Sequence, residues 1–314
     1  MKIENFLQLT NFNEFKTMGK KLIEIDNLPK WFWDKATMPL NYNMLPDYCK
    51  LVNEYRMRYI EIEFEDDVVG FVFKVVQIIK TKQIRLFEVP FSLNNNNNNI
   101  KIVITHLYNM LQNNCVILSS LYKTGILDVD NCNFYYNYDY YINRVTNKYR
   151  RQHRFSRYEN NFTLQILKTL DKNNEIIFMN IYNKWHELKN NAASSQPFLH
   201  ALKQKNKENK YLYYIGTLNN IPCICGIGII TKYGLYIIFE YSLDRTNILY
   251  DNIVIYTSKI LSEQLYKQFN IYNIYKLGAR KNDKGLINFK KRTSEDKVNI
   301  YKLNIIQLLE QLDK

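Results

Sequence analysis

The fold is decided by residues 211–241, which read YLYYIGTLNNIPCICGIGIITKYGLYIIFEY. This stretch holds three runs rich in β-branched and aromatic residues, at 211–217, 221–230 and 235–241. Asn219-Asn220 separates the first run from the second, and residues 231–234 separate the second from the third. Runs of this composition bounded by Asn and Gly are typical of strands joined by tight turns. We therefore predict a three-stranded antiparallel meander.

The same order of elements occurs in the first half of the chain. Three runs of strand-like composition lie there at residues 59–64, 68–79 and 84–89. Each set of three strands is followed by a helical pattern, at 100–113 and 249–269, and then by a short apolar run, at 116–121 and 271–277. Phe87-Glu88 closes the third run of the first half, as Phe239-Glu240 nearly closes that of the second. Hairpins are common, but the ordered agreement of five elements predicts an internal repeat.

The repeated order resembles that of the GNAT acyltransferase fold, in which one strand and one or two helices precede three antiparallel strands, a helix and another strand. The resemblance implies two tandem GNAT-like domains, each a mixed, mostly antiparallel sheet flanked by helices. The fold class is α/β, or α+β in a stricter naming. We place the boundary between residues 140 and 141. An N-terminal domain then covers 1–140, and a C-terminal domain, expected to carry the donor site, covers 141–314.

Composition excludes two classes of protein. With 46% hydrophobic and 15% aromatic residues, the chain of 314 residues is not disordered. It has no run of about 18 apolar residues that could span a bilayer, and its N-terminus lacks the apolar core of a secretory signal. We therefore expect a cytoplasmic protein without a transmembrane segment.

The net charge of +13 predicts attraction to polyanions: RNA, DNA, nucleotide phosphates or an anionic membrane surface. The asparagine run at residues 94–99 indicates a solvated loop, and we draw no function from it. Five cysteines, an odd number, do not form a disulfide framework, so reduced thiols are expected. Cys223 and Cys225 alternate along a predicted strand and are either two small core residues or a metal pair. No second pair of ligands stands out, and we expect no metal site.

Two stretches resemble the Fem family of aminoacyl-tRNA-dependent peptidyl transferases and the C-terminal domain of phosphatidylglycerol lysyltransferases. Residues 141–155, YINRVTNKYRRQHRF, are similar to the basic helix that opens the second domain in these families. Residues 276–290, KLGARKNDKGLINFK, are similar to their late signature of Gly, then Gly-Leu, then Phe-Lys. The resemblance covers nearly the whole chain, although its motifs are short.

The first stretch belongs to a strongly basic segment. Residues 144–157 contain six Lys and Arg side chains and no acid. Such like-charge crowding destabilises a helix unless an anion compensates it. The phosphates of tRNA, CoA or a nucleotide would do so, and the segment could otherwise be a solvated basic helix. The candidate donor-binding side chains are Lys148, Arg150, Arg151, Arg154 and Arg157.

The second stretch offers a second anion site. Gly278 is expected at the end of a strand and Gly285 at the start of a helix, where backbone N–H groups face an anion. Lys290 could neutralise a phosphate or the oxyanion that forms when an amine attacks an ester or thioester. The Fem resemblance implies that Lys290 belongs to the aminoacyl-donor site. The alternative is a further surface lysine beside Lys291 and Arg292.

The place of the usual CoA loop lacks glycine. Acetyl-CoA-dependent GNAT enzymes hold the pyrophosphate in a Gly-rich loop after the fourth strand, because only Gly lets the backbone approach closely. Residues 241–248, YSLDRTNI, contain no glycine, and neither do residues 90–99. This departure disfavours standard CoA binding and is tolerated in the Fem and lysyltransferase groups, whose donor is an aminoacyl-tRNA.

An attacking amine must lose a proton, so a carboxylate near the centre of the sheet is a natural base. Glu240 and Asp283 are the candidates, and Glu240 could instead be a paired structural carboxylate. Tyr241 could act as an acid toward the leaving group. Trp31-Phe32-Trp33 could line an acceptor pocket or form part of the core.

Three functions remain open. The first is an N-acyltransferase that moves an aminoacyl group from aminoacyl-tRNA directly to a small molecule, peptide, amino-sugar nucleotide or lipid head group, without a bound cofactor. The second keeps the fold but takes acyl-CoA as donor. The third is a non-catalytic nucleic-acid-binding module with salt-dependent affinity.

Overall fold

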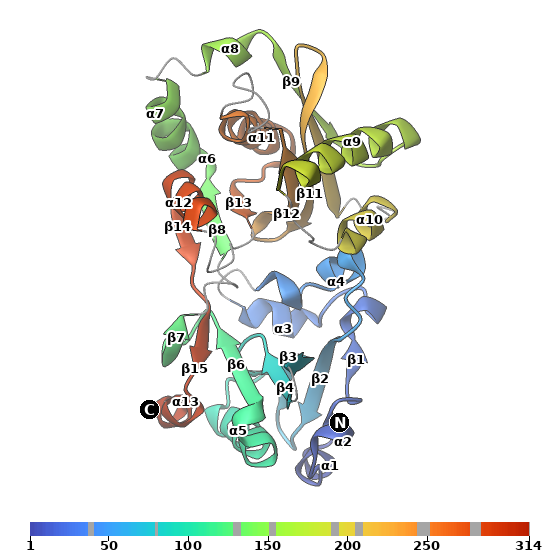
Figure 1. Ribbon diagram of the computed structural model, residues 1–314. Coiled ribbons are helices and arrows are strands. Elements are labelled where there is room, and N and C mark those ends of the chain that lie inside the picture. Colours follow the sequence, from blue (N-terminus) through green and yellow to red (C-terminus); the bar gives the residue numbers. More distant parts are fainter. Residues whose placement is uncertain are drawn as a thin grey trace. The chain divides into compact units, whose positions relative to one another are not determined.

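The computed structural model describes residues 1–36, 41–78, 81–127, 133–150, 155–189, 195–204, 210–243, 252–276 and 284–313. The chain forms two compact units (Figure 1). Unit 1 consists of Met1–Asn131 and Asn299–Lys314, and unit 2 of Cys132–Val298. This division differs from the single boundary expected between residues 140 and 141, because the C-terminal segment belongs to unit 1.

Unit 1 is built on an eight-stranded sheet with the strand order β1-β2-β3-β4-β6-β15-β7, and β5 pairs with β3. Its strands are β1 (Lys20–Lys21), β2 (Met57–Glu63), β3 (Val68–Ile78), β4 (Thr81–Leu86), β5 (Phe91–Ser92), β6 (Cys115–Ser119), β7 (Gly125–Leu127) and β15 (Tyr301–Leu303). Its helices are α1 (Ile3–Leu7), α2 (Phe12–Phe15), η1 (Leu22–Glu24), α3 (Lys30–Lys35), η2 (Tyr42–Met44), α4 (Pro46–Val52), α5 (Asn97–Leu111), η3 (Gln112–Asn114) and α13 (Ile305–Leu312).

Unit 2 is built on a seven-stranded sheet with the order β14-β8-β13-β12-β11-β10-β9. Its strands are β8 (Asn133–Asn137), β9 (Phe162–Leu167), β10 (Tyr211–Leu218), β11 (Ile221–Thr231), β12 (Gly234–Ser242), β13 (Asn273–Lys276) and β14 (Asp296–Val298). Its helices are α6 (Tyr138–Tyr140), the π-helix η5 (Tyr141–Thr146), α7 (Asn147–Arg150), α8 (Ser156–Glu159), α9 (Lys172–Lys189), α10 (Gln196–Leu202), α11 (Ile253–Phe269) and α12 (Lys284–Thr293).

The predicted repeat is confirmed. The antiparallel meander β2-β3-β4 of unit 1 corresponds to β10-β11-β12 of unit 2. Each meander is followed by a long helix, α5 or α11, and then by a strand that pairs in parallel with the last strand of its meander. The class is the predicted mixed α/β arrangement, with a mostly antiparallel sheet in each unit.

The two units exchange strands. In unit 1, β15 from the end of the chain lies between β6 and β7 and pairs with both in antiparallel fashion. In unit 2, β8 from the middle of the chain takes the equivalent place between β13 and β14. Each sheet is therefore completed by a strand that follows the elements of the other unit in sequence. This exchange is the reason why no single cut divides the chain.

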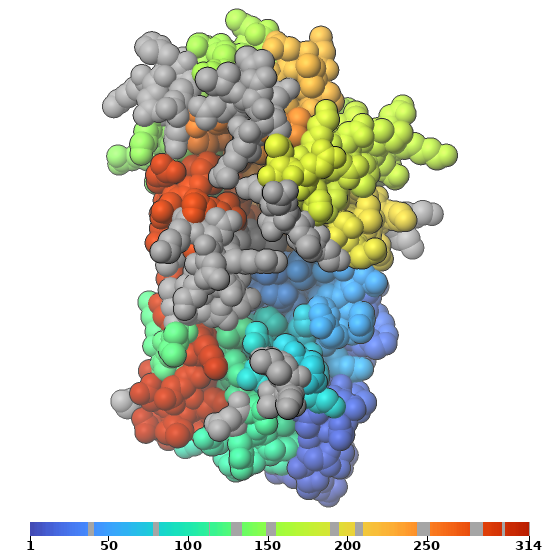
Figure 2. Space-filling model, viewed as in Figure 1, coloured from blue at the N-terminus to red at the C-terminus, as the bar shows by residue number. Residues whose placement is uncertain are grey.

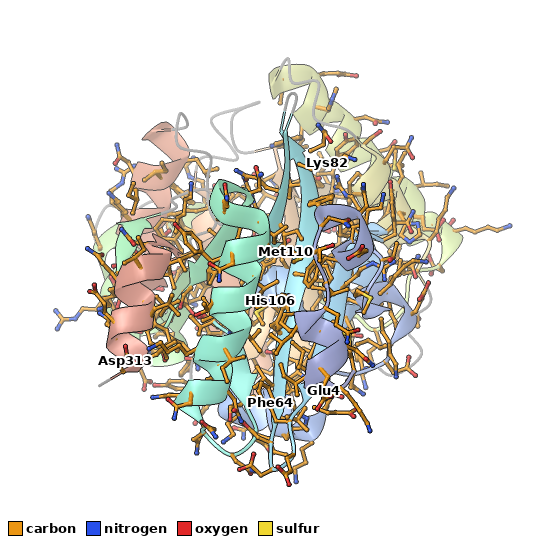
Figure 3. The ribbon with its side chains drawn as sticks, turned by 90° about the horizontal axis from the view of Figure 1, so that it is seen from below. Glu4, Phe64, Lys82, His106, Met110 and Asp313 are labelled. Atoms are coloured by element: carbon orange, nitrogen blue, oxygen red, sulfur yellow. The ribbon has the colours of Figure 1, made fainter. Side chains whose placement is uncertain are left out.

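The core of unit 1 lies between its sheet and the helices α1, α5 and α13. Phe71 and Phe73 of β3 pack there with Leu107 of α5 and Leu308 of α13, all at most 1% exposed. Figure 3, seen from below, shows these helices side by side in front of the sheet, with His106 and Met110 on α5 and Asp313 at the end of α13. Because Leu308 is part of this core, residues of the C-terminal segment contribute directly to the stability of unit 1.

The asparagine run, predicted as a solvated loop, begins a helix. Asn96 caps α5 by accepting hydrogen bonds from the backbone N–H groups of Asn98 and Asn99. Asn99 is 7% exposed and donates from Nδ2 to Asp67 Oδ2 at 3.0 Å. The prediction was wrong for the second half of the run, because a capping side chain and a buried carboxylate satisfy amides that a loop would leave to water.

No helix in the described part of the chain is long and apolar enough to cross a membrane.

Candidate functional site

The parallel pair β12–β13 of unit 2 separates before β12 ends. Its ladder runs from Leu235↔Ile274 to Ile237↔Lys276, whereas β12 continues to Ser242. On the other side of β12, Ile227 pairs with Phe239 and Gly228 with Ile237, so Ile238 is an extra residue in β12. Such a β-bulge bends a strand and redirects the side chains that follow it. Glu240 lies just beyond this bulge.

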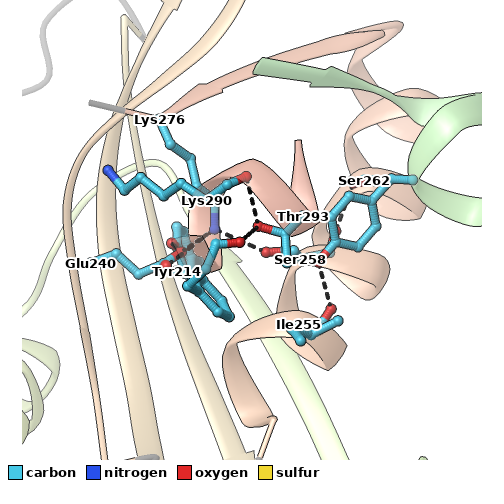
Figure 4. A network of polar contacts seen from close by, with 10 residues as sticks. Tyr214, Glu240, Ile255, Ser258, Ser262, Lys276, Lys290 and Thr293 are labelled. Carbon is cyan, nitrogen blue, oxygen red and sulfur yellow. Dashed lines mark hydrogen bonds and ion pairs between the residues drawn. The ribbon is translucent and has the colours of Figure 1, made fainter. Parts of the chain in front are cut away.

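A polar network lies on the α11 side of the opening (Figure 4). Glu240 accepts a hydrogen bond on Oε2 from the Tyr214 hydroxyl at 2.6 Å. The Lys276 Nζ atom lies 3.2 Å from Glu240 Oε1 and 3.4 Å from Oε2, and donates to Ser258 Oγ at 3.1 Å. The side chains of Lys276 and Glu240 are only 12% and 17% exposed. One ion pair thus links β12 to β13 where their backbone ladder stops.

A glycine makes room for this network. Tyr214, Gly226 and Glu240 are register partners across β10, β11 and β12, so they lie in one row on the same face. A Cβ atom at residue 226 would lie 2.2 Å from Cζ and 2.3 Å from Oη of Tyr214. The phenol ring therefore crosses the sheet over Gly226 to reach the carboxylate, which any larger residue would prevent.

The electrostatics keep both donors protonated. Burial lowers the pKa of Lys276, but the Glu240 carboxylate and the Tyr136 hydroxyl raise it by more, and the net direction is upward. Burial first, and then the charge of Glu240, raise the pKa of Tyr214 well above its ordinary value. Burial also raises the pKa of Tyr136, by more than its interactions with Lys276 and the neighbouring serines lower it. Lys276 is thus an ammonium, and both phenols are neutral donors, across the physiological range.

Tyr241 points to the other face of the sheet from Glu240. Its ring lies 4.8 Å from the ring centroids of both Trp185 and Phe198, in an aromatic cluster under α9 and α10. In Figure 2 the side chains of these two helices, yellow-green and yellow, form adjoining parts of the surface of unit 2. Burial raises the pKa of Tyr241. Because neighbouring strand residues face opposite ways, the structure does not bring Tyr241 to Glu240.

Lys290 lies near the network. It belongs to α12, and its Nζ atom is 5.9 Å from the ring centroid of Phe134, the register partner of Lys276 on β8. Gly285 is exposed in the first turn of the same helix, as predicted from the Gly-Leu motif. Asp283 and Gly278 lie outside the described residues. The structure thus places Lys290, Lys276 and Glu240 on one side of the sheet.

The basic segment is only partly described. Lys148 in α7 is exposed, and Arg157 in α8 is exposed with its guanidinium 6.0 Å from the Tyr158 ring centroid. Arg150 ends α7, and nothing is described of its side chain. Arg151 and Arg154 lie outside the described residues. The role of this segment in binding phosphate therefore stays a prediction.

The remaining sequence candidates have structural roles. Cys223 and Cys225 are fully buried, and burial raises the pKa of both thiols, to about 12 for Cys223. Within the described residues, no group of three or more His, Cys, Asp or Glu side chains could hold a metal ion. Phe32 is a core residue of unit 1, 1% exposed, and the Trp31 indole donates to Glu61 Oε1 at 3.1 Å.

Sequence reasoning missed Lys276, Tyr214 and Ser258 as members of the network. A weak signal existed for Lys276, since it ends a run of apolar and aromatic residues where a lysine is buried only if paired. Tyr214 gave none, because it is one of 26 tyrosines. Its importance follows from the register with Gly226 and Glu240, which only the folded sheet defines.

The equivalent place in unit 1 holds Glu88, two residues beyond the end of the parallel ladder at Leu86↔Ile117. This carboxylate is 3% exposed and accepts four hydrogen bonds. The donors are Val89 N (3.0 Å), Ser119 Oγ, Ser120 N (2.9 Å) and Ser120 Oγ (2.9 Å). No lysine or arginine pairs with it among the described residues. At the end of the parallel ladder in unit 1, the carboxylate is thus bonded by neutral donors.

No family model matches the chain, and no curated protein sequence matches it. Solved structures share its fold. The structure of L-PGS from Bacillus licheniformis aligns with a TM-score of 0.53 at 10% identity, over 95% of this chain and 97% of that one. The crystal structure of FemX aligns with a TM-score of 0.52 at 11% identity, over 93% and 96%. A conserved protein of unknown function from Bacteroides thetaiotaomicron VPI-5482 aligns with a TM-score of 0.56 at 11% identity, over 84% and 90%. The predicted resemblance is confirmed at the level of the fold.

Proposed function

We propose that the protein is an acyltransferase that moves an aminoacyl group from aminoacyl-tRNA to an amine or hydroxyl acceptor by direct transfer. One observation carries the proposal: the parallel strands β12 and β13 separate at Ile237↔Lys276, and a shielded ammonium–carboxylate pair lies at that point. A strand opening of this kind exposes backbone groups of β12 to a bound chain, and a cation there stabilises negative charge on an acyl oxygen.

The choice of donor rests on charge and on the missing glycine loop. A net charge of +13 favours a polyanionic partner such as tRNA. Residues 241–248, where a Gly-rich pyrophosphate loop would be expected, contain no glycine. The fold shared with L-PGS and FemX supports acyl transfer in general and does not choose the donor. We assign two cations to the donor. One is Lys276 at the strand opening, and the other is Lys290 on the same side of the sheet.

The alternative donor is acyl-CoA, bound without the usual glycine loop. The strand opening itself is compatible with both donors. The acceptor in either case is a small amine, amino sugar, peptide or lipid head group.

Donor binding can be tested by thermal unfolding of the protein with charged tRNA, uncharged tRNA, acetyl-CoA and longer acyl-CoAs, each at low and high salt. A ligand that binds only the folded state raises the melting temperature. We expect stabilisation by charged tRNA that exceeds that by uncharged tRNA and persists at the higher salt. Lys290→Ala should reduce it, whereas Lys291→Ala, the matched control on the same helix, should not.

Two results would contradict this proposal. Stabilisation by a CoA species, lost in Lys290→Ala, would make the protein an acyl-CoA-dependent enzyme. Equal binding of any RNA that disappears at high salt would indicate a non-catalytic nucleic-acid-binding module.

A further inference from the structure

The geometry of Glu240 argues against its role as the general base. A base must aim a free lone pair at the proton that it removes, at about 2.6–3.2 Å. Glu240 Oε2 accepts from Tyr214, and both carboxylate oxygens face Lys276 Nζ. The carboxylate is thus already occupied by a phenol and an ammonium.

Lys276, by contrast, is a donor that a substrate oxygen can share. An ammonium carries three N–H donors. Lys276 Nζ lies within hydrogen-bond distance of three oxygens, Glu240 Oε1, Glu240 Oε2 and Ser258 Oγ. Because two of these oxygens belong to one carboxylate, a single bifurcated N–H can serve both and leave an N–H for an incoming oxygen. The Tyr136 hydroxyl, on a side chain 1% exposed, lies in the same buried region and interacts with the side chains of Ser258 and Ser262. Tyr136 also interacts electrostatically with Lys276 and helps to keep it protonated.

We infer that Lys276 is the catalytic cation of the proposed transfer, donating a hydrogen bond to the acyl carbonyl oxygen, and that Glu240 and Tyr214 are positioning residues that hold its ammonium. The inference rests on the proposed function and assigns the groups that perform it. Lys276 is the last residue of β13 paired with β12, so its side chain lies where the two strands separate.

The reaction balances without a proton on Glu240. The lone pair of the acceptor amine forms a bond to the acyl carbon, and the carbonyl π electrons move to oxygen, where the Lys276 N–H stabilises the negative charge. The oxyanion re-forms the carbonyl as the bond to the ribose oxygen breaks. The proton lost by nitrogen goes to that oxygen, directly or through water, and Lys276 ends in its original state.

Burial gives the ammonium its effect. A charge shielded from water interacts more strongly with a developing oxyanion than an exposed one. The groups that face Lys276 are Glu240 on β12, Ser258 on α11 and Tyr136 on β8. Two further residues hold these groups in place. Tyr214 of β10 donates a hydrogen bond to Glu240, and Ser262 of α11 donates one to the Ser258 carbonyl. Such a set holds the ammonium in place before the substrate arrives.

The test is the single-turnover rate of acyl transfer, with the donor dissociation constant and thermal unfolding measured on the same variants. Lys276→Met should lower the rate by about 10²- to 10³-fold, as removal of an oxyanion donor does, with little change in donor affinity. Lys276→Arg, which restores a cation, should recover part of the rate. Lys259→Met is the matched control, because Lys259 forms an ion pair with Glu263 on α11.

The variants of Glu240 separate a positioning residue from a base. Gln keeps one acceptor oxygen, with two lone pairs, in place of two. Glu240→Gln should therefore retain part of the hold on Lys276 and keep the rate within about tenfold, whereas Glu240→Ala should lose about 10²-fold. A general base predicts instead that Gln and Ala are equally damaging. The pH profile of Glu240→Gln should retain the shape of the parent profile.

If Lys276→Met does not fold, the double variant Lys276→Met with Glu240→Gln removes both charges and leaves no uncompensated ion. Full activity in Lys276→Met or in the double variant would overturn the inference while leaving acyl transfer intact. Equal losses in Glu240→Gln and Glu240→Ala would overturn the positioning role. Failure of the parent protein to transfer any acyl group from tRNA or CoA would overturn the proposed function and this inference with it.

Discussion

The two units carry equivalent carboxylates at the end of equivalent strands, and they use them differently. In unit 1, β3 and β4 pair without interruption up to Phe73↔Leu86, and Glu88 accepts four hydrogen bonds from neutral donors. In unit 2, Ile238 is an extra residue, and Glu240 pairs with the Lys276 ammonium and the Tyr214 phenol. Unit 2 thus differs from unit 1 by one inserted residue, Ile238, and by one lysine, Lys276, which pairs with the carboxylate.

The comparison teaches that element order does not decide chemistry. Both units contain Phe-Glu at this place, and both carboxylates link the last meander strand to the parallel strand beside it. Neutral donors in unit 1 offer nothing to a substrate, since each is already bonded to Glu88. The donor in unit 2 is instead a charged ammonium, two of whose three acceptors belong to one carboxylate. We therefore expect a single donor site per chain.

The largest expected effect concerns the exchanged C-terminal segment. Leu308→Ala should lower the free energy of unfolding of unit 1 by about 4 kcal/mol, because Leu308 is fully buried against α5 and truncation leaves a cavity. Hydrogen exchange should show faster exchange in α5 and β6 and unchanged exchange in β10–β12. Ile306→Ala, at a residue 57% exposed on the same helix, is the control. Loss of protection confined to unit 2 would contradict the assignment of this segment to unit 1.

The second prediction concerns the glycine under Tyr214. Gly226→Ala should destabilise unit 2 by about 3 kcal/mol, at the upper end for overpacking, because its Cβ would lie 2.2 Å from Tyr214 Cζ. Gly70→Ala in unit 1 should cost less, about 1 kcal/mol, since its Cβ would meet only the far ends of Tyr59 and Trp31, at 2.7 and 3.0 Å. Urea unfolding followed by local hydrogen exchange measures both. A larger loss for Gly70→Ala would show that the ring over Gly226 has room to move.

The smallest effect is a pH dependence in unit 1. Burial raises the pKa of Glu88 by more than its hydrogen bonds lower it. Because the pKa of Glu88 is higher in the folded state, its protonation stabilises the fold. This contribution is complete below the ordinary pKa of about 4.5, and it is lost as the pH rises through the pKa of the folded state. Glu88→Gln, which does not titrate, should therefore cost about 2 kcal/mol near pH 4 and less at pH 7.

Urea unfolding of the parent protein and Glu88→Gln at several pH values checks this sign, with the exposed Glu310→Gln as control for the loss of a charge. A difference that grows as the pH rises would mean that neutral donors favour the charged form of Glu88.

Much of the fold followed from the sequence, because strand and helix patterns are local. The runs at 211–217, 221–230 and 235–241 became β10, β11 and β12 almost residue for residue. Glu240 followed as well, since its place at the end of a strand is visible in the chain. The helix start within the asparagine run did not, because the carboxylate that receives Asn99 is Asp67, distant in sequence.

The amino-acid sequence by itself determined two similar domains of mixed α/β class, a basic chain and a carboxylate at the end of a central strand. These properties depend on hydrophobic periodicity, turn residues and charge, each of which acts over a few neighbouring positions. Only the tertiary structure decided that β8 and β15 change places and that Lys276, Tyr214 and Ser258 meet Glu240. Sheet register and helix packing bring these residues together across the chain, and no local pattern encodes such a meeting.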